Sequence, residues 1–394
     1  MMSVTPPTLG TDAFCFTDIE ILKIYVPYES LNAYKTATNW NSYEDRIFPM
    51  SYTTIPGYGE DEGNYRFIAS PLVGNTDPLT VDNMINEAAY DLYRFDQSED
   101  AEWQNYKANS FNLVNGQGYL YANAEDVNIV FKGNFNEDES KEVSLTYDAN
   151  ATFAGWNLVG NPFPISAYAN RSYYMMNEDG TAVEPNLVSS ATPISACIGI
   201  MVMAEAEGET IVFSTEAPET APDKGCLQIA LSQIVNRDSP STIRQAQGSG
   251  TLLDKAIVSF NTNDRLEKFV FNKDNARISI PQGGKDLAIA CTDKQGELPL
   301  NFKATKNGQY TITVNGESVE MDCLHLIDNL TGADVDLLVV PSYTFEAKTT
   351  DYASRFRLVF STKETDGPST GSGTCDKLSK YATACCNSLR LVWG

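Results

Sequence analysis

The residues that could do chemistry in this chain are few and widely spaced. His325 is the only histidine among 394 residues, and it lies in Asp322-Cys-Leu-His-Leu-Ile-Asp328. In a strand, Cys323 and His325 would share one face, because successive side chains alternate between faces. Such a pair could act as a nucleophile and its base, but no oxyanion-binding element lies beside it in the sequence. We therefore interpret His325 as a strand residue and expect no catalytic residue.

The sequence also lacks the motifs of common metal and cofactor sites. A single histidine cannot build a histidine-rich zinc or copper centre, and no EF-hand calcium loop occurs. No phosphate-binding glycine pattern lies between a strand and a helix. A pair of carboxylates could serve a glycosidase, but with 52 acidic residues the sequence neither nominates nor excludes one. We expect no metal and no cofactor.

Two aromatic residues are candidate ligand contacts. Trp103 and Tyr106 lie in the polar segment Glu102-Trp-Gln-Asn-Tyr-Lys107, between predicted strands. Exposed aromatic rings beside amide groups can stack on the apolar faces of sugars. A tryptophan that anchors a loop on its own domain has the same local sequence, so both interpretations stay open.

Negative charge is concentrated in the middle of the chain. The formal net charge is −24, and residues 51–220 hold 26 acidic and 6 basic side chains. Such a surface repels phosphates and anionic headgroups, so nucleic acid and membrane surfaces are poor partners. Solubility of an exported protein explains this charge, and capture of cations or of a basic partner is the alternative. No run approaches the roughly 18 apolar residues of a membrane helix, so we expect no membrane insertion.

The cysteines fall into two groups. Five are far apart and mostly within apolar runs, which is typical of buried thiols rather than of a disulfide framework: Cys15, Cys197, Cys226, Cys291 and Cys323. Cys375, Cys385 and Cys386 follow a Gly/Ser-rich spacer in a basic segment without strand alternation. We expect residues 363–394 to form a flexible tail.

The elements that would position these residues are mostly strands. In residues 1–48, Leu22 to Val26 alternates and ends at Pro27, and Tyr28 to Trp40 has the apolar spacing of an amphipathic helix. Residues 50–220 and 225–362 each carry alternating runs at spacings of about 8–12 residues, as in β-sandwich domains. The predicted runs include Tyr90–Phe95, Gly118–Ala122, Val127–Phe131 and Lys268–Phe271. The fold class is therefore mainly β, with two antiparallel β-sandwich domains of jelly-roll or Ig-like type.

The sequence also contains an internal repeat, a predicted linker and a predicted polar loop. Gly118-Tyr-Leu-Tyr-Ala-Asn-Ala-Glu125 and Ile129-Val-Phe131 parallel Gly199-Ile-Met-Val-Met-Ala-Glu-Ala-Glu207 and Ile211-Val-Phe213. The repeat indicates one domain with two related halves that use the same hairpin, and convergent strand sequences are the alternative. We predict a linker at 215–224 and a polar loop at 234–250.

The first segment resembles the end of a BspA-like leucine-rich-repeat array of Bacteroidetes surface proteins. The residues that carry the resemblance are Pro6 to Phe14, Leu22 to Pro27, Glu29 to Lys35 and Ala37 to Trp40. The resemblance implies that residues 1–48 are a terminal leucine-rich repeat with its capping helix. It also implies further repeats and a signal peptide upstream, since the start of the chain has neither a basic nor an apolar signal region.

The two predicted sandwiches resemble modules of the same surface proteins. Tyr90 to Phe95, Asn115 to Ala122 and Gly155 to Phe163 are similar to modules that follow a passenger region. Phe302 to Ala304, Leu324 to Gly332 and Tyr343 to Phe360 are similar to the sandwich that precedes a type IX secretion sorting domain. The tail departs from this pattern, because no small β sorting domain follows Phe360.

The resemblance implies a secreted, non-enzymatic cell-surface protein that works in adhesion or other protein–protein interactions. Its expected partners are host or bacterial surface proteins, and we expect a monomer. The alternatives are a carbohydrate-binding accessory module that contacts glycans through Trp103 and Tyr106, or a purely structural stalk or secretion spacer.

Overall fold

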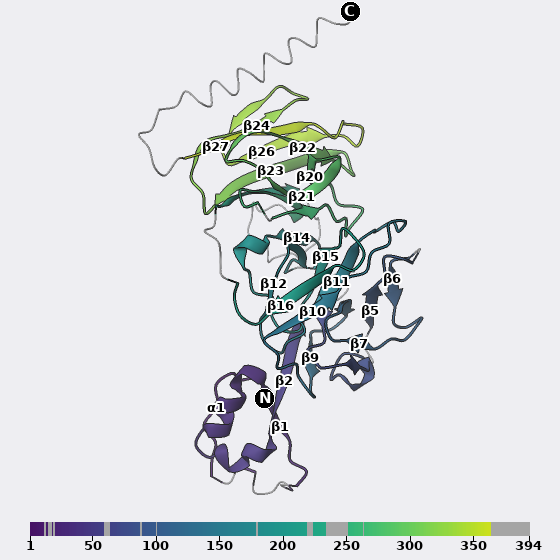
Figure 1. Cartoon of the computed structure of the whole chain (residues 1–394), viewed down its shortest axis with the longest axis vertical. Helices are drawn as coiled ribbons and strands as arrows, with labels where there is room; N and C mark the ends of the chain where they lie inside the picture. The colour runs from purple at the N-terminus through teal and green to yellow at the C-terminus, as the bar shows by residue number, and fades with distance from the viewer. Residues whose placement is uncertain are drawn as a thin grey trace, which may run out of the picture. The chain divides into compact units, whose positions relative to one another are not determined.

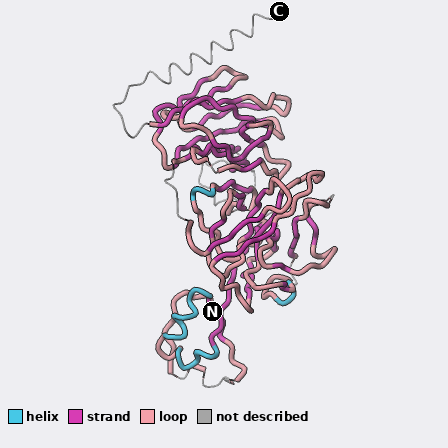
Figure 2. Tube along the Cα trace, in the orientation of Figure 1, coloured by secondary structure: helices cyan, strands magenta, loops and turns pink. Residues whose placement is uncertain are grey.

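Strands dominate the computed structural model of the chain, and the α-helix α1 lies within the first 50 residues (Figures 1 and 2). The structure describes residues 1–11, 13–14, 18, 20–58, 64–86, 89–99, 101–178, 180–218, 224–233, 251–262 and 264–363. The chain forms two compact units. Unit 1 comprises Met1–Gly180 and Ala191–Glu219, and unit 2 comprises Thr181–Ser190 and the chain from Thr220 onward. Within the described ranges, no helix has the length and apolar character needed to cross a membrane.

Unit 1 begins with a strand, a helical segment and a second strand that pairs with the first. β1 (Ile24–Pro27) and β2 (Ile47–Ile55) pair in parallel, with Ile24 opposite Ile47. The chain between them forms η1 (Tyr28–Ser30), α1 (Leu31–Thr36) and η2 (Asn41–Arg46). Ile24, Val26, Tyr34, Trp40 and Ile47 form a small core between strands and helix. The two strands and the helical chain between them (Figure 1) therefore bury their own apolar side chains, which a lone strand and helix could not do.

The helix between β1 and β2 is shorter than predicted. Tyr28–Ser30 form a 3₁₀ turn and α1 ends at Thr36, whereas the apolar spacing predicted one helix to Trp40. Ala37 is extended, with ψ 148°, and Asn39 is left-handed, with φ 67°. The break lets the Trp40 indole turn back, where its Nε1–H donates to the Pro7 carbonyl at 2.8 Å.

The first half of the remaining unit 1 is built around β8 (Gly118–Asn123). β8 lies between β3 (Arg66–Ala69) and β5 (Tyr90–Phe95), and β5 also pairs with the edge strand β6 (Trp103–Asn105). β9 (Val127–Phe131) pairs antiparallel with β2 in another sheet. The minor elements are β4 (Asn75–Thr76), η3 (Pro78–Thr80) and β7 (Leu113–Val114).

The second half repeats this arrangement. β15 (Gly199–Met203) lies between β11 (Trp156–Gly160) and β13 (Tyr173–Met176). β16 (Thr210–Ser214) pairs with β10 (Ser140–Ser144) and β12 (Tyr168–Ala169) in another sheet. In each half, the strand that begins with a glycine, β8 or β15, is central in its sheet. The strand that follows it in the sequence, β9 or β16, belongs to another sheet. The prediction that each half uses a hairpin was wrong, because β8 pairs with β3 and β5 while β9 pairs with β2.

The two halves meet through matched backbone contacts. Gly160 N–H donates to the Gly116 carbonyl at 2.9 Å, and Ala69 N–H donates to the Cys197 carbonyl at 2.8 Å. Gly116 and Cys197 each stand two positions before the glycine of the central strand, and both have positive φ, 97° and 63°. The junction therefore uses the same local geometry twice, once from each half.

Unit 2 is built on one long, folded-over sheet. In the described part its order is β25-β24-β27-β22-β20-β21-β18-β17-β23-β26, and β19 also pairs with β21. The bounds are β17 Cys226–Gln233, β18 Thr251–Ser259, β19 Leu266–Glu267, β20 Arg277–Gln282, β21 Lys285–Cys291, β22 Gln295–Lys303, β23 Gly308–Glu317, β24 Met321–Asp328, β25 Asp334–Asp336, β26 Ser342–Ala347 and β27 Phe356–Thr362. Alternate residues of these strands, such as Leu227, Ile229 and Leu231, point into one core. Residues 181–190 contain β14 (Val183–Asn186), which is a strand of the sheet β11-β15-β13-β14, and η4 (Val188–Ser190).

Two predictions for this unit need correction. The run Lys268–Phe271 is not a strand, because only Leu266 and Glu267 pair with β21. The Lys268 side chain is instead buried, and its Nζ donates to Asp254 Oδ1 at 2.5 Å. The pairing is also not wholly antiparallel, since β18 and β21 run parallel. The predicted loop at 234–250 and the tail from 364 lie outside the described residues.

Candidate functional site

Trp103 lies in a row of half-buried aromatic rings on one face of β5 and β6. The register places Trp103 opposite Phe95 and Asn105 opposite Tyr93, so these side chains share a face. The rings of Phe95 and Trp103 meet edge to face, with centroids 5.1 Å apart. Phe95 also contacts Phe153 of the second half at 6.0 Å. The tryptophan therefore packs on its own unit while one side stays accessible.

Tyr106 belongs to the opposite face. Its backbone N–H donates to the Leu92 carbonyl at 2.9 Å, and its ring packs against the core that includes Leu92. The Tyr106 ring meets Phe111 edge to face at 5.3 Å. Trp103 and Tyr106 therefore do not form one joint platform. That either residue contacts a ligand stays a prediction.

Tyr65 and Tyr93 extend the aromatic row beside Trp103. Their ring centroids lie 6.5 Å apart. Burial, Tyr93 and the Asp91 carboxylate raise the pKa of Tyr65 to about 12, so its hydroxyl remains a hydrogen-bond donor at neutral pH. We call Tyr65, Tyr93, Phe95 and Trp103 the aromatic row. Rings with hydroxyl, amide and carboxylate neighbours can bind a sugar and repel an anion.

A second surface lies on the outer face of the β1–β2 ladder, and the sequence did not single it out. Tyr25 and Phe48 are register partners, both half-buried, with ring centroids 5.9 Å apart. Lys132 Nζ lies 4.6 Å from the centroid of the Tyr25 ring and forms an ion pair with Asp82. We call Tyr25, Phe48 and Lys132 the ladder surface. The parallel register of β1 and β2 brings Tyr25 and Phe48 together, and the pairing of β2 with β9 places Lys132 near them, so no local sequence pattern could reveal this surface.

His325 lies in strand β24, as predicted, and offers no catalytic arrangement with its neighbour. Its Nδ1 lies 2.7 Å from Asp334 Oδ1. Cys323 is disulfide-bonded, so the prediction of a buried thiol at this position was wrong. A disulfide-bonded cysteine cannot supply the thiolate that a cysteine–histidine mechanism requires.

Of the other described cysteines, Cys197 and Cys226 are buried free thiols, as predicted, and Cys291 is a half-buried one. Cys197 is fully buried and shares a hydrogen bond of 3.1 Å with Ser51 Oγ. Burial raises the pKa of Cys197 to about 12, which keeps the nucleophilic thiolate form rare. Burial and the Asp264 carboxylate also raise the pKa of Cys291. Cys15, Cys375, Cys385 and Cys386 lie outside the described residues.

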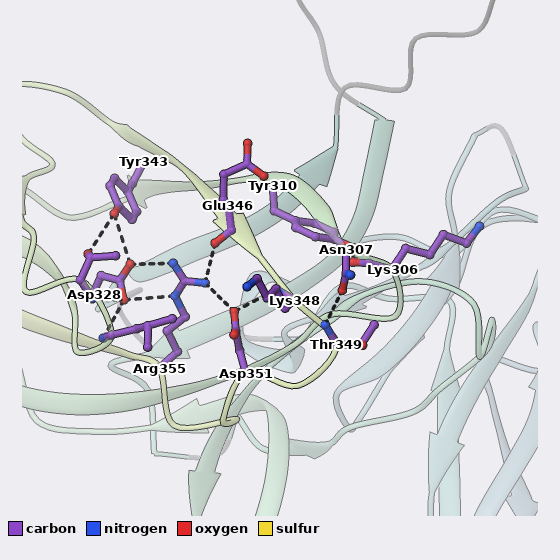
Figure 3. Close-up of polar contacts among 12 residues, drawn as sticks. Lys306, Asn307, Tyr310, Asp328, Tyr343, Glu346, Lys348, Thr349, Asp351 and Arg355 are labelled. Carbon is purple, nitrogen blue, oxygen red and sulfur yellow. Dashed lines mark hydrogen bonds and ion pairs between the residues drawn. The ribbon is translucent and has the colours of Figure 1, made fainter.

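A buried ion pair in unit 2, between Arg355 and Asp328, stabilises the fold. Arg355 donates to both carboxylate oxygens of Asp328, at 3.1 and 2.8 Å, and both side chains are 1 % exposed (Figure 3). Its Nη1 also donates to Asp351 Oδ2 at 3.2 Å. Burial alone would raise the pKa of Asp328, but hydrogen bonds from Arg355 and from a backbone N–H lower it. All these groups satisfy one another, which leaves no open position for a substrate.

Within the described ranges, no group of three or more His, Cys, Asp or Glu side chains could hold a metal ion. No protein-family model, no curated protein and no solved structure matches this chain. The aromatic row and the ladder surface are therefore the two candidate functional sites.

Proposed function

We propose that this chain is a non-enzymatic module of a bacterial cell-surface protein, of the BspA-like leucine-rich-repeat kind, that takes part in adhesion. In this proposal residues 1–48 are the last repeat and its cap, followed by two β-sandwich domains. The protein reaches the cell surface by type IX secretion as part of a longer exported chain. Its partners are host or bacterial surface proteins.

The observation that carries the proposal is the parallel register of β1 and β2. Ile24 lies opposite Ile47, which is an offset of 23 positions. Leucine-rich repeats are about 20–29 residues long and stack one strand per repeat in parallel. In such solenoids the strand faces form the binding surface, and here that face carries Tyr25 and Phe48. Aromatic residues are favoured at protein interfaces, while the acidic middle of the chain keeps nucleic acid and anionic membranes away.

The experiment is a binding assay with the purified chain on immobilised host matrix and bacterial surface proteins. We expect at least one partner to bind, and the double variant Tyr25→Ala/Phe48→Ala to lose about tenfold or more in affinity, because interface aromatics carry much of the binding energy. Trp103→Ala is the matched control and should bind as the unchanged chain does. Uniform absence of binding would favour a structural stalk instead.

A second candidate function is carbohydrate binding, which the aromatic row favours. Trp103, Phe95 and Tyr93 share one strand face beside the Asp91 carboxylate and the Asn105 amide. A glycan array should then give a signal that Trp103→Ala abolishes and that Tyr106→Phe leaves unchanged. A signal that survives Trp103→Ala would exclude this site.

A further inference from the structure

Asn115 lies at the junction of the two halves of unit 1, and all the polar atoms of its side chain are engaged there. Asn115 is 7 % exposed. Its Nδ2 donates to the Ser70 carbonyl of the first half at 3.1 Å and to the Pro162 carbonyl of the second half at 2.9 Å. These two hydrogen bonds fix the orientation of the amide, and its Oδ1 faces Lys141 of β10.

Lys141 brings an amine against this amide. Its Nζ lies 2.5 Å from Asn115 Oδ1 and 3.4 Å from the Asn115 backbone carbonyl oxygen. Both of these partners are neutral, and a neutral partner compensates less than a carboxylate does for the removal of an ammonium from water. Burial lowers the pKa of Lys141, and the Asp138 carboxylate opposes this shift only in part. The neutral amine, which is the nucleophilic form, is therefore easier to reach here than on a lysine in water.

The internal repeat shows that the junction does not require a lysine at this position. Ser51 lies opposite Phe131 in the pairing of β2 with β9, and Lys141 lies opposite Phe213 in the pairing of β10 with β16. Phe131 and Phe213 are equivalent in the repeat, so Ser51 and Lys141 occupy equivalent positions. Ser51 meets the other half through its hydroxyl, which lies 3.1 Å from Cys197 Sγ. A short hydroxyl thus serves in one copy where the other copy carries an amine.

We propose that Lys141 and Asn115 become joined by an amide bond, which links the two halves of unit 1 covalently. The Lys141 ammonium first gives one proton to water, which reaches its half-buried side chain. Nζ then attacks Asn115 Cγ, and the bond between Cγ and Nδ2 breaks. A second Nζ proton moves to the departing nitrogen, so ammonia leaves and an amide between Nζ and Cγ remains. The reaction needs no oxidant, cofactor or second protein.

The position of the amine favours this reaction over the same reaction in solution. Nζ already lies at Oδ1, which is bonded to Cγ, so the attack requires only a small shift of the lysine side chain. The bond would enclose β8 and β9, because the two residues are 26 positions apart. A crosslink of this kind restricts the unfolded chain, as a disulfide does, and it does not depend on a reducing or oxidising environment.

The test is the mass of the purified, unchanged chain, followed by peptide mapping. We expect an intact mass lower than that of the sequence by one ammonia molecule. Trypsin should fail to cleave after Lys141, and one branched product should contain both Asn115 and Lys141. Lys141→Arg, which keeps the positive charge, should restore the full mass, and so should Asn115→Ala. Lys285→Arg is the matched control, because Lys285 pairs with the Glu267 carboxylate, and it should lose ammonia as the unchanged chain does.

The unchanged chain decides the matter even if a variant does not fold. A full intact mass, with separate tryptic peptides for Asn115 and Lys141, would overturn the proposal. Loss of ammonia without a branched product would also overturn it, because an asparagine that closes on its own backbone loses the same mass and joins no peptides.

Discussion

The two halves of unit 1 share one arrangement of strands, but equivalent side chains in the two halves differ in burial. The pairing of Tyr93 with Leu120 and of Tyr174 with Met201 makes Tyr93 and Tyr174 equivalent, because β8 and β15 both begin with a glycine. Tyr174 is fully buried, whereas Tyr93 is half-buried within the aromatic row. The repeat therefore fixes the backbone, and the side chains decide which copy presents a surface.

A large effect on stability is expected from the glycine at the junction of the halves. A Cβ at Gly160 would lie 2.2 Å from the Ala69 Cβ and 2.7 Å from the Gln117 carbonyl oxygen. Gly160→Ala should therefore lower the free energy of unfolding by about 3 kcal/mol or more, as overpacking against backbone does. Urea unfolding measures this loss.

The equivalent residue in the first half offers a matched rescue. Ala69 stands where the second half has Gly160, so Ala69→Gly removes one of the two clashing atoms. The double variant Ala69→Gly/Gly160→Ala should recover part of the loss, and a double variant no more stable than Gly160→Ala would mean that the halves do not meet as described.

The two equivalent tyrosines should differ in their contribution to stability. Tyr174→Ala removes a fully buried ring and should cost about 3–5 kcal/mol. Tyr93→Ala should cost about 1–2 kcal/mol, because its ring already contacts water. The comparison needs only thermal or urea unfolding of the two variants, and equal losses would contradict the division of roles.

Gly116 and Cys197, the two positive-φ residues at the junction, should respond differently to substitution. Gly116→Ala would bring a Cβ within 2.9 Å of Val143 Cγ2 at φ 97°, and it should cost about 1–2 kcal/mol in unfolding free energy. Cys197→Gly relaxes the φ of 63° but loses a buried thiol, so the two effects offset and the change should stay below about 1 kcal/mol. A large loss in Cys197→Gly would show that the thiol, and not the backbone, matters there.

Alkaline pH should lower stability through the buried tyrosines of unit 1. Burial raises the pKa of Tyr119, Tyr121 and Tyr173 to about 12. The unfolded chain releases these protons near pH 10, while the folded chain keeps them to about pH 12, so stability falls as pH rises through this window. The tyrosinate absorbance should rise in step with unfolding. Tyr121→Phe should reduce this sensitivity, and absorbance that rises before unfolding would contradict it.

The sequence predicted the mainly β fold because strand alternation and turn residues are local signals. The repeated glycine-led strands also revealed the two halves. The end of α1 was missed because Asn39 adopts a left-handed backbone that apolar spacing does not encode. The alternation of Lys268–Phe271 predicts a strand, and it gives no sign that the Lys268 side chain is buried in an ion pair with Asp254.

The candidate surfaces were harder to predict because they depend on register. Trp103 lies in strand β6 rather than between strands, and its separation from Tyr106 follows from the pairing with Phe95. The ladder surface joins Tyr25 and Phe48 across a parallel pairing. The hydrogen bond from the Ser189 backbone N–H to Asp264 joins residues 75 positions apart. Such distant partners leave no local pattern.

Photo-crosslinking from the ladder surface tests the proposed function most directly. A photoreactive phenylalanine at position 25 would be compared with the same group at position 103, on chains bound to host or bacterial cells. We expect position 25 to capture a surface protein reproducibly and position 103 to give none. Capture at position 103 alone, or at neither position, would contradict an adhesion function through the ladder surface.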